Sequence, residues 1–392
     1  VIDPRCTWIA SRAKLWLQLR PGTDAALGLG FIHVMIREDL INTSFVEKWT
    51  NAPFLVRVDS TPHTLLRESD LDPSGSDENF IAWNPDTGSA MVWDVDAQLY
   101  KDSSTLPSLE GEFDVRLADG SIISAKTVWT LYKENAAGYT PQVVSKITWV
   151  PEDKIIKGAR MYAQSSPSAL HWGLPIDTIP STIPTSQALN HLWVLTGNLD
   201  NPGGNAIARY AYDVVTYPYH SGGAVLSLPP ETAEKRIGMH DYGPIRDFRA
   251  WAQPDKMLEQ IFSKDPYEIK GMWIQTANPL ACTGMEPQKW HKAIKKLDFT
   301  VCVDLFMTPT AMLCDVILPA ASFLEKDSLK AWWVPLNAIK KVTQVGECRS
   351  DIEINLELCK RFMKDFPYQN TQELFDRLLS SAGLTYDELC DN

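Results

Sequence analysis

Acidic and amide side chains follow apolar segments of the chain at positions where they could bind a nucleotide. Asp304 comes after the apolar run 299–303, and Asn278 lies in a sharp turn after the apolar run 271–276. Such runs predict buried parallel strands, and a right-handed crossover brings both turns to one edge of the sheet. A carboxylate there can accept hydrogen bonds from a ribose or a guanine. For Asn278 the alternative is a structural Asx-turn.

The segment after Asp304 predicts the rest of this wall. Thr308 precedes Pro309, which is the usual order of a helix N-cap and first helical residue. The N-terminus of that helix would face the oxygens of a ligand. A second short strand is predicted over 315–318, ending at Pro319. From the pattern alone, the block also suits any α/β half-domain.

A similar arrangement opens the chain. Asp3 and Arg5 follow two apolar residues, as at a strand end, where the acid could hold a ribose and the arginine a base. Pro21 and Gly22 predict a turn, and Thr23 or Asp24 predicts the cap of a helix reaching about residue 39. The alternative is a plain turn and cap.

His171 is the candidate for contact with a substrate. We expect a short strand over 168–173 to deliver His171, Trp172 and Gly173, with Ile176 just beyond. The alternative is a hydrogen-bonded loop histidine.

The elements around these residues predict an α/β protein with two doubly wound, Rossmann-like domains and mostly parallel sheets. We expect a first domain over 1–204 and a second over 205–392, in which 205–250 is a long connection. Turn residues within alternating patterns predict hairpins at 80–94 and 111–128, inside a β-rich insertion at about 51–136. Helical spacing predicts further helices at 151–164, 185–195, 287–297, 352–362 and 371–380.

Composition excludes several classes of protein. The 392 residues carry a net charge of −12, which argues against a general nucleic-acid binder. The sequence contains no run of 18 apolar residues, so it predicts no membrane-spanning helix. The seven cysteines are scattered without a spacing that would hold zinc or an iron–sulfur cluster, so we expect most to be buried free thiols.

The wording of 303–326, V-D-x-F-x-T-x-T-A-x-x-x-D-V-I-L-P-A-x-x-x-x-E-K, closely resembles the molybdopterin-guanine-dinucleotide enzymes of the dimethyl-sulfoxide-reductase family. Two further sequence motifs resemble the same family. One is D-P-R followed by P-G-T-D-A-A-L, and the other is T-G-N-L-x-x-P-G-G-N at 196–205. The β-rich insertion resembles its acetylene-hydratase and transhydroxylase branch.

The resemblance implies a cofactor-binding set in each half of the chain. In it, Asp351 takes the place of a carboxylate that accepts from guanine N–H groups, and Lys326 resembles a lysine that contacts the dinucleotide. Lys326 is otherwise a solvated charge. The implied set of the first domain is Asp3, Arg5, Gly22, Asp24, Trp172 and Ile176. The implied set of the second domain is Asn278, Asp304, Thr308, Lys326 and Asp351.

The resemblance also implies two molybdopterin guanine dinucleotides with molybdenum or tungsten, and two-electron redox chemistry on a small substrate. We expect the chain to be the central fragment of a longer polypeptide, inactive alone. The resemblance implies that a segment before this chain carries a [4Fe–4S] cluster and usually the metal-ligating residue, so we expect no metal ligand within this chain. It also implies a C-terminal β-barrel domain after the chain and an iron–sulfur subunit as electron partner. The compartment stays open between cytoplasm and, behind a twin-arginine signal, periplasm.

Two alternatives stay open. One is a non-redox hydratase or transhydroxylase with the same cofactor. The other is a cofactor-free structural subunit, similar to the large iron–sulfur subunit of respiratory NADH dehydrogenase. Asp304, Lys326 and Asp351 argue against the second, because a scaffold has no use for groups that bind guanine.

Overall fold

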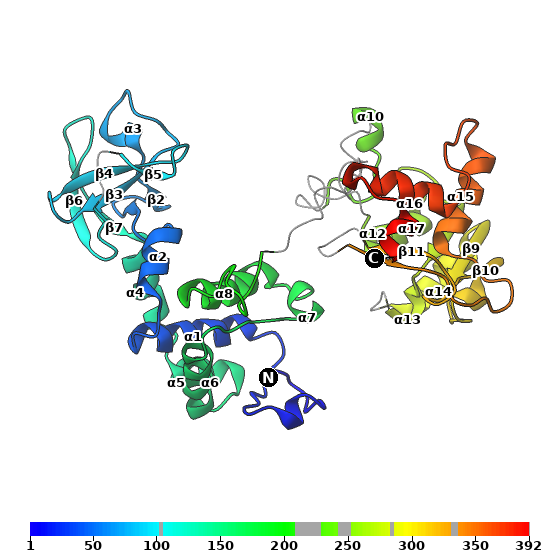
Figure 1. The fold of residues 1–392 in the computed structure, drawn as a ribbon, viewed down its shortest axis with the longest axis horizontal. Coiled ribbons are helices and arrows are strands. Elements are labelled where there is room, and N and C mark those ends of the chain that lie inside the picture. The colour runs from blue at the N-terminus through cyan, green and yellow to red at the C-terminus, as the bar shows by residue number, and fades with distance from the viewer. Residues whose placement is uncertain (102–104, 208–228, 242–251, 283–285, 331–335, 392) are drawn as a thin grey trace. The chain divides into compact units, whose positions relative to one another are not determined.

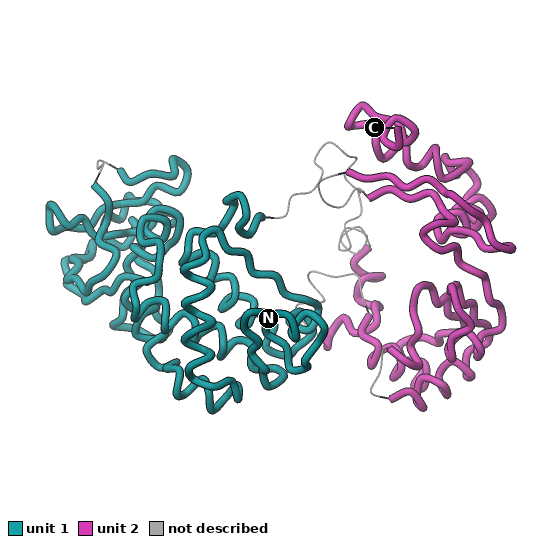
Figure 2. The backbone as a smooth tube through the Cα atoms, turned by 60° about the horizontal axis from the view of Figure 1, so that its bottom comes forward, with its two compact units in different colours: residues 1–207 teal, residues 208–392 magenta. Residues whose placement is uncertain are grey.

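The computed structural model describes residues 1–101, 105–207, 229–241, 252–282, 286–330 and 336–391. The chain forms two compact units, unit 1 over 1–207 and unit 2 over 208–392 (Figure 2). Most of the predicted connection at 205–250 lies outside the described residues.

A helical body forms one part of unit 1, and α1 lies at its centre (Figure 1). Helix α1 buries Phe31, Ile32 and Met35 in a core shared with the other helices. It approaches α5 closely because Gly30 has no side chain: a Cβ there would lie 2.9 Å from the buried Val144. The helical elements are η1 (Ala10–Arg12), α1 (Asp24–Arg37), α2 (Thr43–Trp49), α4 (Val128–Ala137), α5 (Pro141–Thr148), α6 (Glu152–Gln164), α7 (Leu174–Asp177) and α8 (Thr182–Leu195).

The other part of unit 1 is rich in strands, and α2 and α4 adjoin it (Figure 1). Both predicted hairpins are confirmed, with turns in which Gly88 and Gly120 take positive φ of 66° and 84°. The sheets have the strand orders β2-β1-β7-β6 and β3-β4-β5. The elements are β1 (Leu55–Arg57), β2 (Thr64–Leu65), α3 (Glu68–Leu71), β3 (Phe80–Asn84), β4 (Ser89–Asp94), β5 (Leu99–Tyr100), β6 (Glu112–Arg116) and β7 (Ile122–Thr127).

The mostly parallel sheet predicted for the first domain does not appear among the described residues of unit 1. All its paired strands are antiparallel there, and several are joined by tight turns that permit no other pairing. Parallel pairing is limited to isolated bridges, Ile2 with Leu17 and Leu199 with Asn205. Unit 1 therefore combines a helical body with antiparallel sheets.

Unit 2 contains the predicted parallel sheet, in the order β10-β9-β8. Asp304 at the end of β9 pairs with Pro319, and Val303 pairs with Gln275 at the end of β8, so the three carboxyl ends share one edge. Helix α14 packs against the sheet through Ile294. The elements up to this sheet are α10 (Pro230–Ala233), α12 (Pro254–Ser263), β8 (Gly271–Gln275), α13 (Pro279–Cys282), α14 (Pro287–Lys296), β9 (Phe299–Asp304), η2 (Ala311–Leu313) and β10 (Val316–Pro319).

The rest of unit 2 adds a small hairpin and helices around Phe375, Leu379 and Tyr386. These elements are β11 (Ser328–Lys330), β12 (Asn337–Ile339), α15 (Asp351–Phe362), α16 (Thr371–Leu379), η3 (Ser380–Ala382) and α17 (Tyr386–Asp391). No helix in the described ranges is long and apolar enough to cross a membrane.

Two predictions about local features of the chain are wrong. The helix expected after Thr308 is a single 3₁₀ turn, η2, because the carboxylate of Asp315 holds the start of the next strand. Its Oδ2 accepts hydrogen bonds from Thr300 N and Oγ1, both at 2.8 Å. The cysteines are also more accessible than expected: only Cys302 and Cys348 are buried.

Candidate functional site

The carboxyl edge of the parallel sheet in unit 2 holds all five residues predicted for the second site. Asp304 shapes the first loop, since its Oδ1 accepts from Phe306 N at 3.1 Å. Thr308 acts in the same loop, where its Oγ1 accepts from Ala311 N at 3.1 Å. Both side chains therefore fix the loop that leaves β9.

Asn278 is oriented by a buried threonine that sequence reasoning did not single out. The hydroxyl of Thr310 accepts from Leu280 N at 3.2 Å, so its proton is free to bond Asn278 Oδ1 at 2.7 Å. The NH₂ group of Asn278 is left as a donor toward a ligand, because it has no partner among the described residues.

Asp351 and Lys326 are in contact, although 25 residues separate them. The Lys326 ammonium lies 3.2 Å from Asp351 Oδ2, and the Gln275 amide donates to Asp351 Oδ1 at 2.9 Å. Burial acts to raise the pKa of Asp351, but the bonds from Gln275 and Lys326 outweigh it and hold the pKa below its usual range. The carboxylate is therefore ionised at neutral pH.

The local sequence places Asp351 at the start of α15. Ser350 is the N-cap and its Oγ accepts from Glu353 N at 3.1 Å, while Glu353 Oε2 accepts from Ser350 N at 2.7 Å. This capping box satisfies two free N–H groups of the helix end, those of Ser350 and Glu353, without using the side chain of Asp351. The side chains of Asp351 and Lys326 stay 26% and 28% exposed, so both remain accessible to a ligand.

These groups fit a purine nucleotide. The edge offers a carboxylate as acceptor, an ammonium and an amide NH₂ as donors, and loops that follow parallel strands. Guanine presents N–H donors beside a carbonyl oxygen, which matches an acceptor next to a cation. Gln275 belongs to this set. The sequence feature that could have identified it is a polar residue at the end of an apolar strand.

In unit 1, a pocket of about 530 Å³ brings together five of the residues predicted for the first half of the chain. Burial raises the pKa of Asp24, the first residue of α1, above its ordinary value. Arg5 and Gly22 do not line this pocket. The predicted residues that line it are Asp3, Asp24, His171, Trp172 and Ile176.

Asp3 and Gly22 have structural roles in the adjoining loops, where Arg5 takes part through its backbone N–H. Asp3 Oδ1 accepts from Arg5 N at 2.7 Å, and the Trp16 indole donates to Asp3 O at 2.9 Å. Gly22 has φ of 79°, which its turn requires and other residues rarely adopt. Thr23 makes no capping hydrogen bond to α1; its hydroxyl donates to Arg20 O at 2.7 Å instead.

The segment carrying His171 and Trp172 has no regular secondary structure and is not the strand that we predicted. Its backbone groups bond to side-chain amides instead of a neighbouring strand. Asn205 Oδ1 accepts from Leu170 N at 2.8 Å and Asn205 Nδ2 donates to Leu170 O at 2.7 Å. Asn198 Oδ1 accepts from Ser168 N at 3.2 Å.

These two asparagines belong to the T-G-N-L-x-x-P-G-G-N motif at 196–205, for which the family resemblance alone gave no role to either side chain. The turn is closed by Asn205 N donating to Asn198 O at 2.8 Å, so both amides are held on one rigid loop. The motif therefore positions the segment that forms one wall of the unit 1 pocket.

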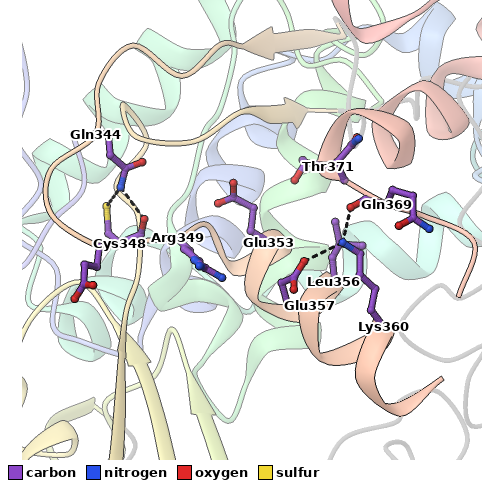
Figure 3. Close-up of a pocket in the computed structure, with 11 residues that line it drawn as sticks. Gln344, Cys348, Arg349, Glu353, Leu356, Glu357, Lys360, Gln369 and Thr371 are labelled. Atoms are coloured by element: carbon purple, nitrogen blue, oxygen red, sulfur yellow. Dashed lines mark hydrogen bonds and ion pairs between the residues drawn. The ribbon is translucent and has the colours of Figure 1, made fainter. Parts of the chain in front are cut away.

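A third pocket, of about 470 Å³, lies over α15 and the start of α16 (Figure 3). It contains none of the predicted site residues. Lys360 bonds Glu357 and the backbone of Gln369 across it, so these polar groups satisfy each other. We do not assign it a ligand.

Residues 1–361 match the molybdopterin oxidoreductase family. The chain belongs to that family. The predicted resemblance is thereby confirmed, and membership implies a molybdopterin cofactor with molybdenum or tungsten. In the described parts of the chain, no three His, Cys, Asp or Glu side chains gather to hold a metal ion.

Its relatives are enzymes. The chain is 28% identical to the dopamine dehydroxylase of Eggerthella lenta over 92% of its own length and 44% of that protein. It is 24% identical to the acetylene hydratase of Syntrophotalea acetylenica, covering 99% of the chain and 46% of the relative. The solved acetylene hydratase from Pelobacter acetylenicus covers 99% of the chain with a TM-score of 0.66 and 23% identity, which shows a shared mixed α/β fold. The chain spans less than half the length of these relatives.

Proposed function

We propose that this chain forms the central cofactor-binding portion of an enzyme with two molybdopterin guanine dinucleotides and one molybdenum or tungsten. Each unit would act as a domain, divided near residues 204 and 205, and would bind part of one dinucleotide. The bound cofactor would supply two-electron transfer to a small substrate. The protein's own residues would bind, orient and enclose it.

The observation that carries the proposal is the Gln275–Asp351–Lys326 cluster. Its ionised carboxylate stands at the carboxyl edge of a parallel sheet, where such folds bind nucleotides. Guanine can give Asp351 two N–H bonds, whereas adenine has an acceptor at the N1 position that would meet the carboxylate unfavourably. The cluster therefore favours guanine over adenine.

In unit 1, we propose that the pocket of Asp3 and Asp24 receives the other dinucleotide, against Trp172 and Ile176. The carboxylates supply acceptors for hydroxyl or N–H groups, and the exposed His171 at the mouth would meet substrate. The side-chain amides of Asn198 and Asn205, which we call the amide clamp, hold the pocket wall that carries His171 and Trp172 in place.

The test of the guanine site compares binding of GMP and AMP to the chain by calorimetry. We expect GMP to bind more tightly than AMP. Asp351→Asn should weaken GMP binding about 10- to 100-fold, which corresponds to the free energy of charge-assisted hydrogen bonds. Glu357→Gln, an exposed change on the same helix, is the matched control and should leave GMP binding unchanged. Equal affinity for GMP and AMP would contradict the assignment of Asp351.

Redox and hydration chemistry are separated by assay of the longer protein. We propose oxidoreduction, with a [4Fe–4S] cluster in an N-terminal region and an iron–sulfur subunit as electron partner. Turnover that requires an artificial electron donor or acceptor supports this proposal. Turnover of an alkyne or alkene without any electron carrier would instead favour a hydratase, the activity that one relative's name records.

A further inference from the structure

A separate pocket of about 300 Å³ lies in unit 1 where α2, α4 and α8 meet. It shares no lining residue with the pocket of Asp3 and Asp24. No Asp, Glu, Lys or Arg lines it. Most of its wall is apolar, formed by Val46, Ala52, Trp129, Val194 and Leu195.

The polar end of this pocket is a pair of aromatic residues. Tyr132 OH lies 2.9 Å from His191 Nδ1, and the two rings meet edge to face with centroids 5.3 Å apart. Trp129 stacks on the other side of Tyr132 at 5.8 Å. Burial lowers the pKa of His191, so the imidazole is neutral at pH 7. The pair is therefore rigid and uncharged.

The second nitrogen of His191 is left over. Nδ1 is occupied by Tyr132, and Nε2 bonds no residue in the described part of the chain. Two further polar residues, Thr50 and the exposed Asn51, line the wall. The Thr50 hydroxyl is already used, because it donates to Val46 O at 2.7 Å and accepts from Ala52 N at 3.1 Å. If Tyr132 donates to Nδ1, Nε2 carries a proton and donates; in the reverse arrangement Nε2 accepts. Either tautomer can bond a hydroxyl group.

We propose that this pocket binds a neutral, single-ring aromatic molecule carrying one hydroxyl group, which bonds to His191 Nε2. A charged ligand is disfavoured because no side chain in the wall could balance it. The volume suits one ring, since a cavity of about 150 Å³ is enough for benzene. Trp129 and Tyr132 supply aromatic faces for the ring. This proposal does not depend on the guanine site.

The experiment is a titration of the full chain with 4-fluorophenol, followed by fluorine NMR. Two further probes are 4-fluorotoluene, which lacks the hydroxyl, and 4-fluorobenzoate, which is charged. His191→Phe removes Nε2 but keeps an aromatic ring, and Val194→Phe fills the pocket. Their matched controls, His63→Phe and Val143→Phe, change the same residue types at exposed positions of unit 1.

We expect saturable binding of 4-fluorophenol at one site. Binding should weaken about 3- to 10-fold in His191→Phe and for 4-fluorotoluene, the weight of one hydrogen bond. It should vanish in Val194→Phe and for 4-fluorobenzoate, and the controls should bind normally. Absence of saturation, or equal affinity for the phenol and the toluene, would overturn the proposal. The ligand comparison uses the unaltered chain, so it holds even if a variant fails to fold.

Discussion

The side-chain amide of Asn205 holds both backbone groups of Leu170, with Oδ1 accepting at 2.8 Å and Nδ2 donating at 2.7 Å. An asparagine side chain thereby pairs with this loop segment as a neighbouring strand does in a sheet. Because His171 and Trp172 follow directly, the clamp sets one wall of the unit 1 pocket.

Replacing this clamp should loosen the pocket. We expect Asn205→Ala to lower the free energy of unfolding by about 1–3 kcal/mol, because two half-buried backbone groups lose their partners. Hydrogen exchange should accelerate at 168–172, measured by mass spectrometry. Asn201→Ala in the same turn is the control, since the Asn201 side chain is exposed. Unchanged exchange in Asn205→Ala would show that the clamp does not order the segment.

The raised pKa of Asp24 predicts how stability varies with pH. Between the unfolded value of about 3.9 and the higher folded value, the folded chain holds a proton that the unfolded chain has lost. Stability from this group therefore falls as pH rises through that window. Asp24→Asn removes the buried charge and should be more stable than the parent at pH 7, with the gap closing toward pH 4.

This trend is measured by urea unfolding across the pH range. The control is Asp96→Asn, an exposed carboxylate, for which the difference from the parent should not widen with pH. A gap between Asp24→Asn and the parent that grows on acidification would contradict the desolvation of Asp24.

The close approach of α1 and α5 gives a packing test. In Gly30→Ala, the new methyl would lie 2.9 Å from Val144, so we expect a loss of about 1–3 kcal/mol that outweighs the gain in helix propensity of about 1 kcal/mol. Val144→Ala should relieve the clash, so the double mutant should be more stable than additivity predicts. Gly138→Ala meets only an ordinary contact at 3.5 Å and serves as the control. Additive losses would mean that the helices can separate freely.

Local patterns predicted much of the fold. The hairpin at 80–94 was predictable because Asn84 accepts the N–H of Asp86 and Gly88 allows the turn. The strand ending at Asp304 was predictable because four successive residues of its apolar run are buried. In both cases the signal lies within a few residues of the structure that it specifies.

The failures depend on distant partners. The segment at 168–170 looks like a strand, but its partners are the side chains of Asn198 and Asn205, about 30 residues away in sequence. Gln275 reads as part of a strand, and its role appears only when Asp351 lies 2.9 Å from it, 76 residues on. The helix predicted after Thr308 is only a 3₁₀ turn, because Asp315 bonds Thr300 at the start of the next strand. The roles of the predicted site residues in cofactor binding stay predictions.

The most direct measurement is metal, pterin and nucleotide analysis of the full-length natural protein, purified without oxygen. From the proposed function we expect about one molybdenum or tungsten per polypeptide, with two pterins and two equivalents of GMP released on acid hydrolysis. Folded protein that lacks pterin, metal and GMP would contradict it and favour a structural subunit.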